Sequence, residues 1–138
     1  MRIMAIDYGK TKVGIAITDP LGVIAQPLLT IPVSSKDELI KRLKFLIHEN
    51  NIALVLIGNP ISNRGQATPM SEEVVKLRNR LKKAINIEVK LWDERYTSQY
   101  ATIMLKEMGV KKSAKKIDQI AASIILEEYL KFRASTFT

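Results

Sequence analysis

Residues 2–18 constrain the fold more than any other stretch, because they hold two apolar segments separated by a short turn. Four apolar residues run directly into Asp7, and residues 13–17 alternate apolar with small side chains after the turn. This pattern predicts a strand, a tight turn and a second, antiparallel strand. Asp7 would then lie where a buried strand meets a loop, where a carboxylate is costly to desolvate without a partner. Asp7 is therefore either an acceptor for the turn amides around Gly9 or a metal ligand.

Three further strands are indicated along the chain. Residues 23–31 form the third, and Pro27 within it favours an edge position because proline cannot donate to the ladder. The continuous apolar run 53–58 is typical of a central strand that is covered on both faces. Residues 87–92 form the last strand, and the polar stretch 59–67 between these two has the composition of a loop.

Helical spacing of apolar residues predicts four helices after the hairpin. Ser35 with Glu38 three residues later resembles a capping box, Pro69 suits a first helical turn, and Gly109 is a stop signal. The predicted helices cover residues 35–50, 69–85, 97–108 and 117–132. A hairpin followed by alternating strands and helices predicts an α/β fold with a mixed sheet, in one domain over residues 1–138.

The charge of the chain indicates a polyanionic partner. The net charge is +8, and residues 59–138 hold 15 Lys/Arg against 9 Asp/Glu, whereas residues 1–58 hold 7 against 5. Such an excess favours nucleic acid first and an anionic membrane second, with a merely soluble basic protein as the alternative. The chain has no cysteine, which excludes disulfides and thiolate metal sites. No apolar run approaches the roughly 18 residues of a membrane span, and no signal-peptide pattern opens the chain, so we expect a cytoplasmic protein without membrane contact.

Acidic residues occur at three places where predicted strands end or a helix begins. Asp7 ends the first strand, Asp93 and Glu94 follow the last, and Asp118 opens the last helix. Ligand sites of open α/β sheets gather beyond the carboxyl ends of parallel strands. Convergent carboxylates there would bind Mg²⁺ or Mn²⁺, and a pair of such ions could activate water and stabilise the leaving oxygen of a phosphodiester. The alternatives are a helix cap or dipole partner for Asp118, and a surface ion pair with Arg95 or a helix cap at 93–95.

Two choices remain at this edge of the sheet: whether Glu94 or Asp93 is the ligand, and whether the nearby cations contact phosphate or only solvent. We prefer Glu94 to Asp93 as the ligand, because its longer side chain better crosses the gap of about 10 Å between strands on either side of a central one. The surrounding cations would contact phosphate, although a solvated surface is the alternative for each. His48 is interpreted as a surface residue rather than a general base, and Trp92 as packing. The candidate nucleic-acid contacts are Lys10, Lys12, Arg64, Arg95, Lys111, Lys112, Lys115 and Lys116.

Four groups of residues, in order along nearly the whole chain, resemble the YqgF family, also called RuvX, of the ribonuclease H-like superfamily. They are Ala5–Gly9 with Val13–Ala16; Gly58–Pro60 with Asn63, Gly65 and Pro69; Asp93–Ser98; and Lys116–Ala122. The resemblance implies a five-stranded mixed sheet in the order 3-2-1-4-5, with the first three strands antiparallel and helices on both faces. It also implies that Asp7, Glu94 (or Asp93) and Asp118 are the catalytic metal ligands.

The resemblance implies a metal-dependent nuclease that matures the 5′ end of pre-16S ribosomal RNA, a step of ribosome biogenesis. Relatives have also been described as Holliday-junction resolvases, and composition does not separate pre-rRNA from branched DNA, or a monomer from a homodimer. The chain departs from the family pattern at Arg64 and at Thr68-Pro69, which affects loop contacts but leaves the carboxylates intact. Two alternatives are a non-catalytic nucleic-acid-binding module and an actin-like phosphotransferase, which needs two such domains.

Overall fold

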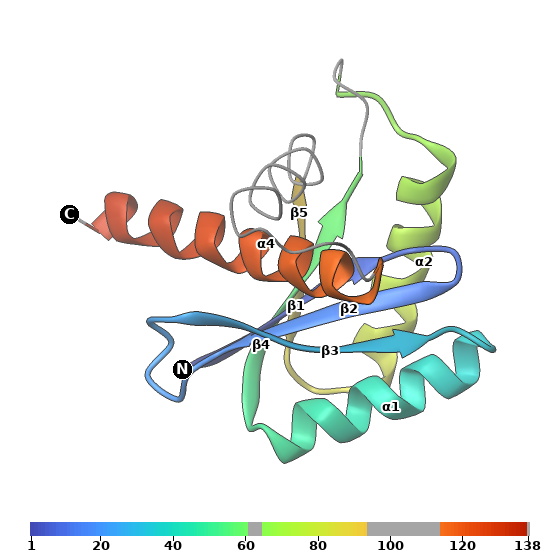
Figure 1. Ribbon diagram of the computed structural model, residues 1–138, viewed down its shortest axis with the longest axis horizontal. Coiled ribbons are helices and arrows are strands. Elements are labelled where there is room, and N and C mark those ends of the chain that lie inside the picture. The colour runs from blue at the N-terminus through green and yellow to red at the C-terminus, as the bar shows by residue number, and fades with distance from the viewer. Residues whose placement is uncertain (61–64, 94–113, 138) are drawn as a thin grey trace.

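The structure, a computed structural model, describes residues 1–60, 65–93 and 114–137, with side chains described over 117–134 of the last helix. Five strands form one sheet in the order β3-β2-β1-β4-β5 (Figure 1). The strands are β1 (Arg2–Tyr8), β2 (Lys12–Thr18), β3 (Ala25–Pro32), β4 (Ile52–Asn59) and β5 (Glu88–Asp93). The described helices are α1 (Lys36–Glu49), α2 (Pro69–Ala84) and α4 (Ala114–Phe137).

The directions of the strands confirm the predicted mixed sheet. β1, β2 and β3 form an antiparallel meander. β4 then pairs parallel to β1, and β5 pairs parallel to β4. β3 lies at one edge of the sheet, as Pro27 predicted. The carboxyl ends of β1, β4 and β5 therefore lie at one end of the sheet, where a site was expected.

Each face of the sheet has its own apolar core, because successive side chains of a strand point to opposite faces. Met4 and Ile6 of β1 belong to the larger core, together with Leu39 of α1 and Leu77 of α2. The neighbouring residues of β1, among them Ala5, belong to a second core with residues of α4. In Figure 1, α4 crosses the sheet on the side opposite to α1 and α2.

Local sequence explains where α1 and α2 begin. The hydroxyl of Ser35 accepts a hydrogen bond from the amide of Glu38 at 3.1 Å, which caps α1 as predicted. α2 has a capping box in which Thr68 and Ser71 bond each other's amides, and Pro69 occupies its first turn. These bonds satisfy amides that otherwise lack partners at a helix start.

Three predicted boundaries were wrong by two or more residues: the start of β3 and both ends of α4, which runs to Phe137 and not to residue 132. β3 begins at Ala25 and not at residue 23, because the carboxylate of Asp19 accepts the amides of Val23 and Ile24 at 2.7 and 2.8 Å and holds them in a loop. α4 begins at Ala114 and not at residue 117, so the segment expected to be a basic connector contributes to the helix. Alanine and lysine are good helix formers, which is consistent with this extension. The predicted helix 97–108 lies outside the described residues.

Candidate active site

The site is built on one row of paired residues across three strands. Asp7, near the end of β1, lies opposite Gly14 of β2, and Gly14 lies opposite Thr30 of β3. Residues directly opposite each other point to the same face of a sheet. Ala5, two positions before Asp7, belongs to the core beneath α4. The side chain of Asp7 is therefore directed to the face that α4 covers.

Gly14 brings α4 onto this row by close backbone contact. A Cβ atom on Gly14 would lie 2.1 Å from the carbonyl oxygen of Asp118 and 2.8 Å from its Cβ. Only glycine leaves room for such an approach. The next residue of α4, Gln119, donates a hydrogen bond from Nε2 to Oγ1 of Thr30 at 3.1 Å. Asp118 is thus held above β2, one strand away from Asp7, and adjacent strands lie only about 4.8 Å apart.

A cavity of about 250 Å³ opens beside Asp118. The turn between β1 and β2 forms one side of it, and Ile117 and Asp118 of α4 form the other. The turn is closed by a hydrogen bond from the amide of Gly9 to the carbonyl of Lys12 at 2.9 Å. Lys10 and Lys12, two predicted phosphate contacts, line this cavity. The structure thus brings two of the predicted cations to one of the predicted carboxylates.

The electrostatics of Asp118 reflect this setting. Partial burial raises the pKa of the Asp118 carboxyl, and the positive charge of Lys12 acts in the opposite direction. The charged carboxylate is therefore less well solvated than on an open surface, and a bound cation would compensate for the lost water. Asp118 lies in the second turn of α4, since the helix begins at Ala114. A role for it as the helix cap is excluded by this position.

The end of β5 distinguishes the two acidic residues that follow the last strand. Trp92 pairs with Gly58 and packs against α4, where its ring lies 5.5 Å from that of Tyr129 and its Nε1 donates to Glu128 at 3.2 Å. Its role is packing, as interpreted from the sequence. Alternation then directs the side chain of Asp93 to the opposite face, away from the face of Asp7. Glu94 lies outside the described residues.

The other predicted contacts divide into two groups. Lys115 and Lys116 belong to the first turn of α4, shortly before Asp118. Those outside the described residues are Arg64, Arg95, Lys111 and Lys112.

Sequence reasoning missed Gly14 and Gln119 as the residues that position Asp118. The only signal for Gly14 was a glycine within an alternating apolar strand, which often marks close backbone approach.

The donor set fits a hard divalent cation. Asp7 and Asp118 offer carboxylate oxygens, the ligands that Mg²⁺ and Mn²⁺ prefer. Within the described part of the chain, no group of three acidic, histidine or cysteine side chains gathers to hold a metal. Glu94, the expected third ligand, is not in that part.

Among the described helices, none is long and apolar enough to cross a membrane.

The strand order and the helices on both faces define a protein with a ribonuclease H-like fold. The chain belongs to the RuvX family, described as Holliday junction resolvase, whose pattern it matches over residues 1–132. A relative from Acetivibrio thermocellus is 43% identical over 134 residues, which cover 94% of this chain and 95% of the relative. One from Dictyoglomus turgidum is 37% identical over 132 residues, 94% of each. Both are named "Putative pre-16S rRNA nuclease".

Solved structures confirm the fold. Thermus thermophilus RuvC in complex with a Holliday junction substrate superimposes with a TM-score of 0.64 at 16% identity, covering 99% of this chain and 97% of RuvC. At that identity the likeness concerns the fold alone. The predicted ribonuclease H-like fold and its strand order are therefore confirmed. The predicted nuclease class is confirmed by the family and by the names of the relatives, whereas the roles of the individual site residues remain predictions.

Proposed function

We propose that the chain is a metal-dependent nuclease that hydrolyses phosphodiester bonds of nucleic acid, with Asp7, Glu94 and Asp118 as its metal ligands. The observation that supports this most is the backbone contact of Gly14 with Asp118, which holds Asp118 one strand from Asp7. Two carboxylates at the same edge of the sheet would repel a phosphate unless a bound cation compensated for their charge. Asp93 is disfavoured as a ligand because β5 directs it to the other face.

The residues of the chain have separate tasks in this proposal. A bound divalent ion would supply Lewis-acid activation of water and neutralise charge on the phosphate. Asp7 and Asp118 hold and orient that ion from β1 and α4. Lys10 and Lys12 attract the phosphate backbone toward the cavity that they line beside Asp118. Gln119 keeps the first part of α4 in place through Thr30.

The favoured substrate is precursor 16S ribosomal RNA, which the names of the relatives at 37% and 43% identity support. Cleavage at the 5′ end of 16S RNA is what the family resemblance implies. A second candidate is branched DNA, since the family description and the RuvC complex both concern Holliday junctions. The net charge of +8 suits either polyanion.

The test is a cleavage panel with precursor 16S RNA, single-stranded RNA and four-way DNA junctions, each with and without Mg²⁺ or Mn²⁺. We expect Asp7→Asn and Glu94→Gln to abolish metal-dependent cleavage while leaving salt-sensitive binding intact. Asp93→Asn is the matched control, because Asp93 lies at the same edge but on the opposite face, and it should cut normally. Undiminished cleavage by Asp7→Asn would refute the proposal, and cleavage by no version of the chain would favour a binding module.

A further inference from the structure

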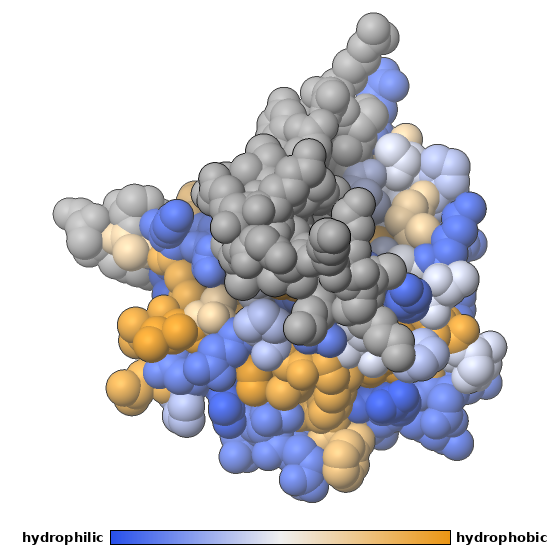
Figure 2. Space-filling view, in the orientation of Figure 1, coloured by the Kyte–Doolittle hydropathy of each residue, from blue (hydrophilic) through white to orange (hydrophobic). Residues whose placement is uncertain are grey.

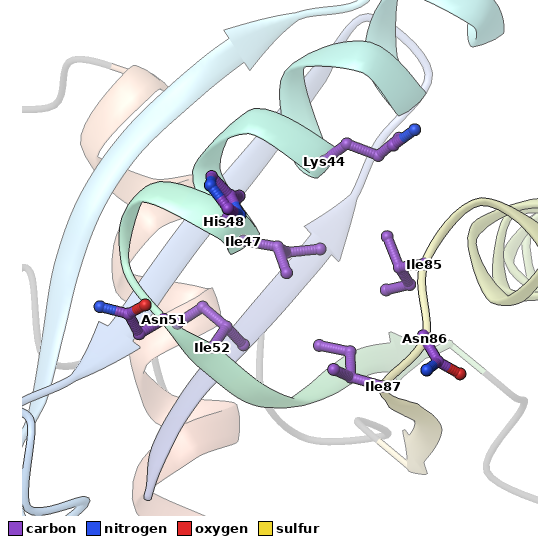
Figure 3. A pocket seen from close by; sticks show the side chains of 8 residues that line it. All are labelled: Lys44, Ile47, His48, Asn51, Ile52, Ile85, Asn86 and Ile87. Atoms are coloured by element: carbon purple, nitrogen blue, oxygen red, sulfur yellow. The ribbon is translucent and has the colours of Figure 1, made fainter.

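A second cavity lies at the other end of the sheet, far from Asp7. It has a volume of about 350 Å³ and lies where β4 and β5 begin and where α1 and α2 end. Figure 3 shows its isoleucine side chains converging from two sides, with Ile47 and Ile52 facing Ile85 and Ile87. We call this cavity the isoleucine slot. Its two walls are purely aliphatic, so the slot suits a flat apolar group.

The rim of the isoleucine slot is polar and carries positive charge. Lys44, His48, Asn51 and Asn86 complete its lining, and all four are exposed. In Figure 3 the amine of Lys44 and the two carboxamides extend outward from the isoleucines. Among the described residues, no Asp or Glu lines the slot. A cationic ligand is therefore disfavoured, and an anionic group at the mouth of the slot would be attracted electrostatically.

Further cations lie on the same two helices, close in sequence to residues that line the slot. Lys41 lies one turn before Lys44 on α1, and Lys82 and Lys83 occupy the last turn of α2, just before Ile85. All three are exposed. None of them forms an ion pair with a described residue, in contrast to the cations near the start of α1, such as Lys36, which binds Glu73 at 2.8 Å. These lysines are thus available to an incoming anion.

We propose that the isoleucine slot binds an unpaired nucleotide of a nucleic-acid strand, with the base between the aliphatic walls and the phosphates at Lys44 and its neighbours. This inference rests on the proposed function, since the strand would be part of the substrate. A nucleotide combines a flat, weakly polar ring with a negative charge, which matches walls and rim together. The volume lies in the range of small-ligand pockets. An acidic peptide with an aromatic anchor is less well matched, because a nucleic-acid strand places a phosphate beside every base, whereas a peptide has no fixed negative charge next to its aromatic side chain.

The position of the slot says which substrates it would favour. β4 begins at Ile52, in the slot, and ends at Asn59, close to the candidate active site. At about 3.3 Å per residue, this strand separates the two sites by roughly 23 Å. A single nucleotide cannot span that distance. The slot would therefore bind an unpaired tail several nucleotides away from the bond that is cut. It would raise affinity for tailed substrates and leave the chemistry unchanged.

The test is methyl NMR on the full chain with labelled isoleucines. Four probes are titrated: a single-stranded RNA hexamer, a blunt duplex of the same sequence, adenosine monophosphate and inorganic phosphate. We expect the hexamer to shift the methyl signals of Ile47, Ile52, Ile85 and Ile87, while Ile125, in the core beneath α4, stays unchanged. Adenosine monophosphate should shift them more weakly, and the duplex and phosphate should not shift them at all.

Variants separate the slot from the candidate active site. Lys44→Ala should weaken hexamer binding about threefold, as expected for one exposed charge contact, and Ile85→Ser about tenfold through lost apolar contact. Lys131→Ala, an equal change of charge on α4, is the matched control and should have no effect. Both slot variants should cut an untailed substrate normally, whereas Asp7→Asn should keep the slot shifts and lose cleavage. If the proposed nuclease activity fails, the shifts therefore still test the slot.

Several outcomes would overturn the inference. They are unchanged slot methyls with the hexamer, equal shifts with the duplex, and tighter binding of adenosine monophosphate than of the hexamer, which would indicate a free nucleotide as the occupant. A peptide with acidic and aromatic residues that shifts the same methyls more tightly than the hexamer would identify a protein partner instead. Because Lys44 is exposed, its variant tests the rim even if Ile85→Ser proves poorly folded.

Discussion

Replacing Gly14 by alanine tests the way in which the site is assembled. The new Cβ would lie 2.1 Å from the carbonyl oxygen of Asp118, whereas ordinary contact begins near 3.4 Å, so the two backbones must separate by about 1.3 Å. Overpacking of this kind typically costs about 1–3 kcal/mol of folding free energy. A displacement of about 1 Å at a reacting centre can cost about 100-fold in rate. We therefore expect a modest loss of stability and a loss of cleavage of at least that order.

The assay compares cleavage rates of Gly14→Ala and wild-type chains well below both melting temperatures. Gly22→Ala is the matched control, because its Cβ would lie 2.2 Å from the carbonyl oxygen of Met1 at the opposite end of β2, at a residue with φ of +73°. It should lose comparable stability and keep its activity. Wild-type cleavage by Gly14→Ala would refute the reasoning, as would an equal loss of activity in both variants.

Two further predictions concern stability. Asp118→Asn should raise the free energy of unfolding at neutral pH while abolishing cleavage, because burial raises the pKa of Asp118 and so disfavours its charged form in the folded chain. Because the pKa of Asp118 is higher in the folded than in the unfolded chain, the stability of the wild type falls as pH rises through these two values. Urea denaturation should therefore show a larger free energy of unfolding for Asp118→Asn than for the wild type at pH 7, and no difference in acid. Thr68→Ala should lower stability by about 1 kcal/mol by removing the capping box of α2. Urea denaturation measures this too, and no loss would show that the cap is redundant.

The sequence predicted the elements whose signals are local. The alternation after Asp7, the buried run of β4 and the cap at Ser35 each depend on neighbours in the chain, and the structure has all three. Pro27 predicted an edge strand for the same reason. The strand order came from the family resemblance, which covered nearly the whole chain.

Features that depend on tertiary contact escaped prediction. The role of Gly14 depends on a helix about 100 residues later in the chain, so a glycine within an apolar strand indicates close backbone approach but not its partner. The choice between Asp93 and Glu94 was argued from side-chain length, although the alternation of β5 decides the direction of Asp93 once Trp92 is known to face α4. The start of α4 was misplaced because lysines near a glycine resemble a loop as much as a helix.

The division of the sheet into two cores has a consequence for how the chain loses activity on heating. Asp7 belongs to the sheet and Asp118 to α4, and the core beneath α1 and α2 contains no described residue of α4. Heating that detaches α4 alone would separate Asp7 from Asp118 and abolish cleavage before that core unfolds. Such a chain would keep Lys10 and Lys12 in the turn between β1 and β2 and would still attract nucleic acid without cutting it.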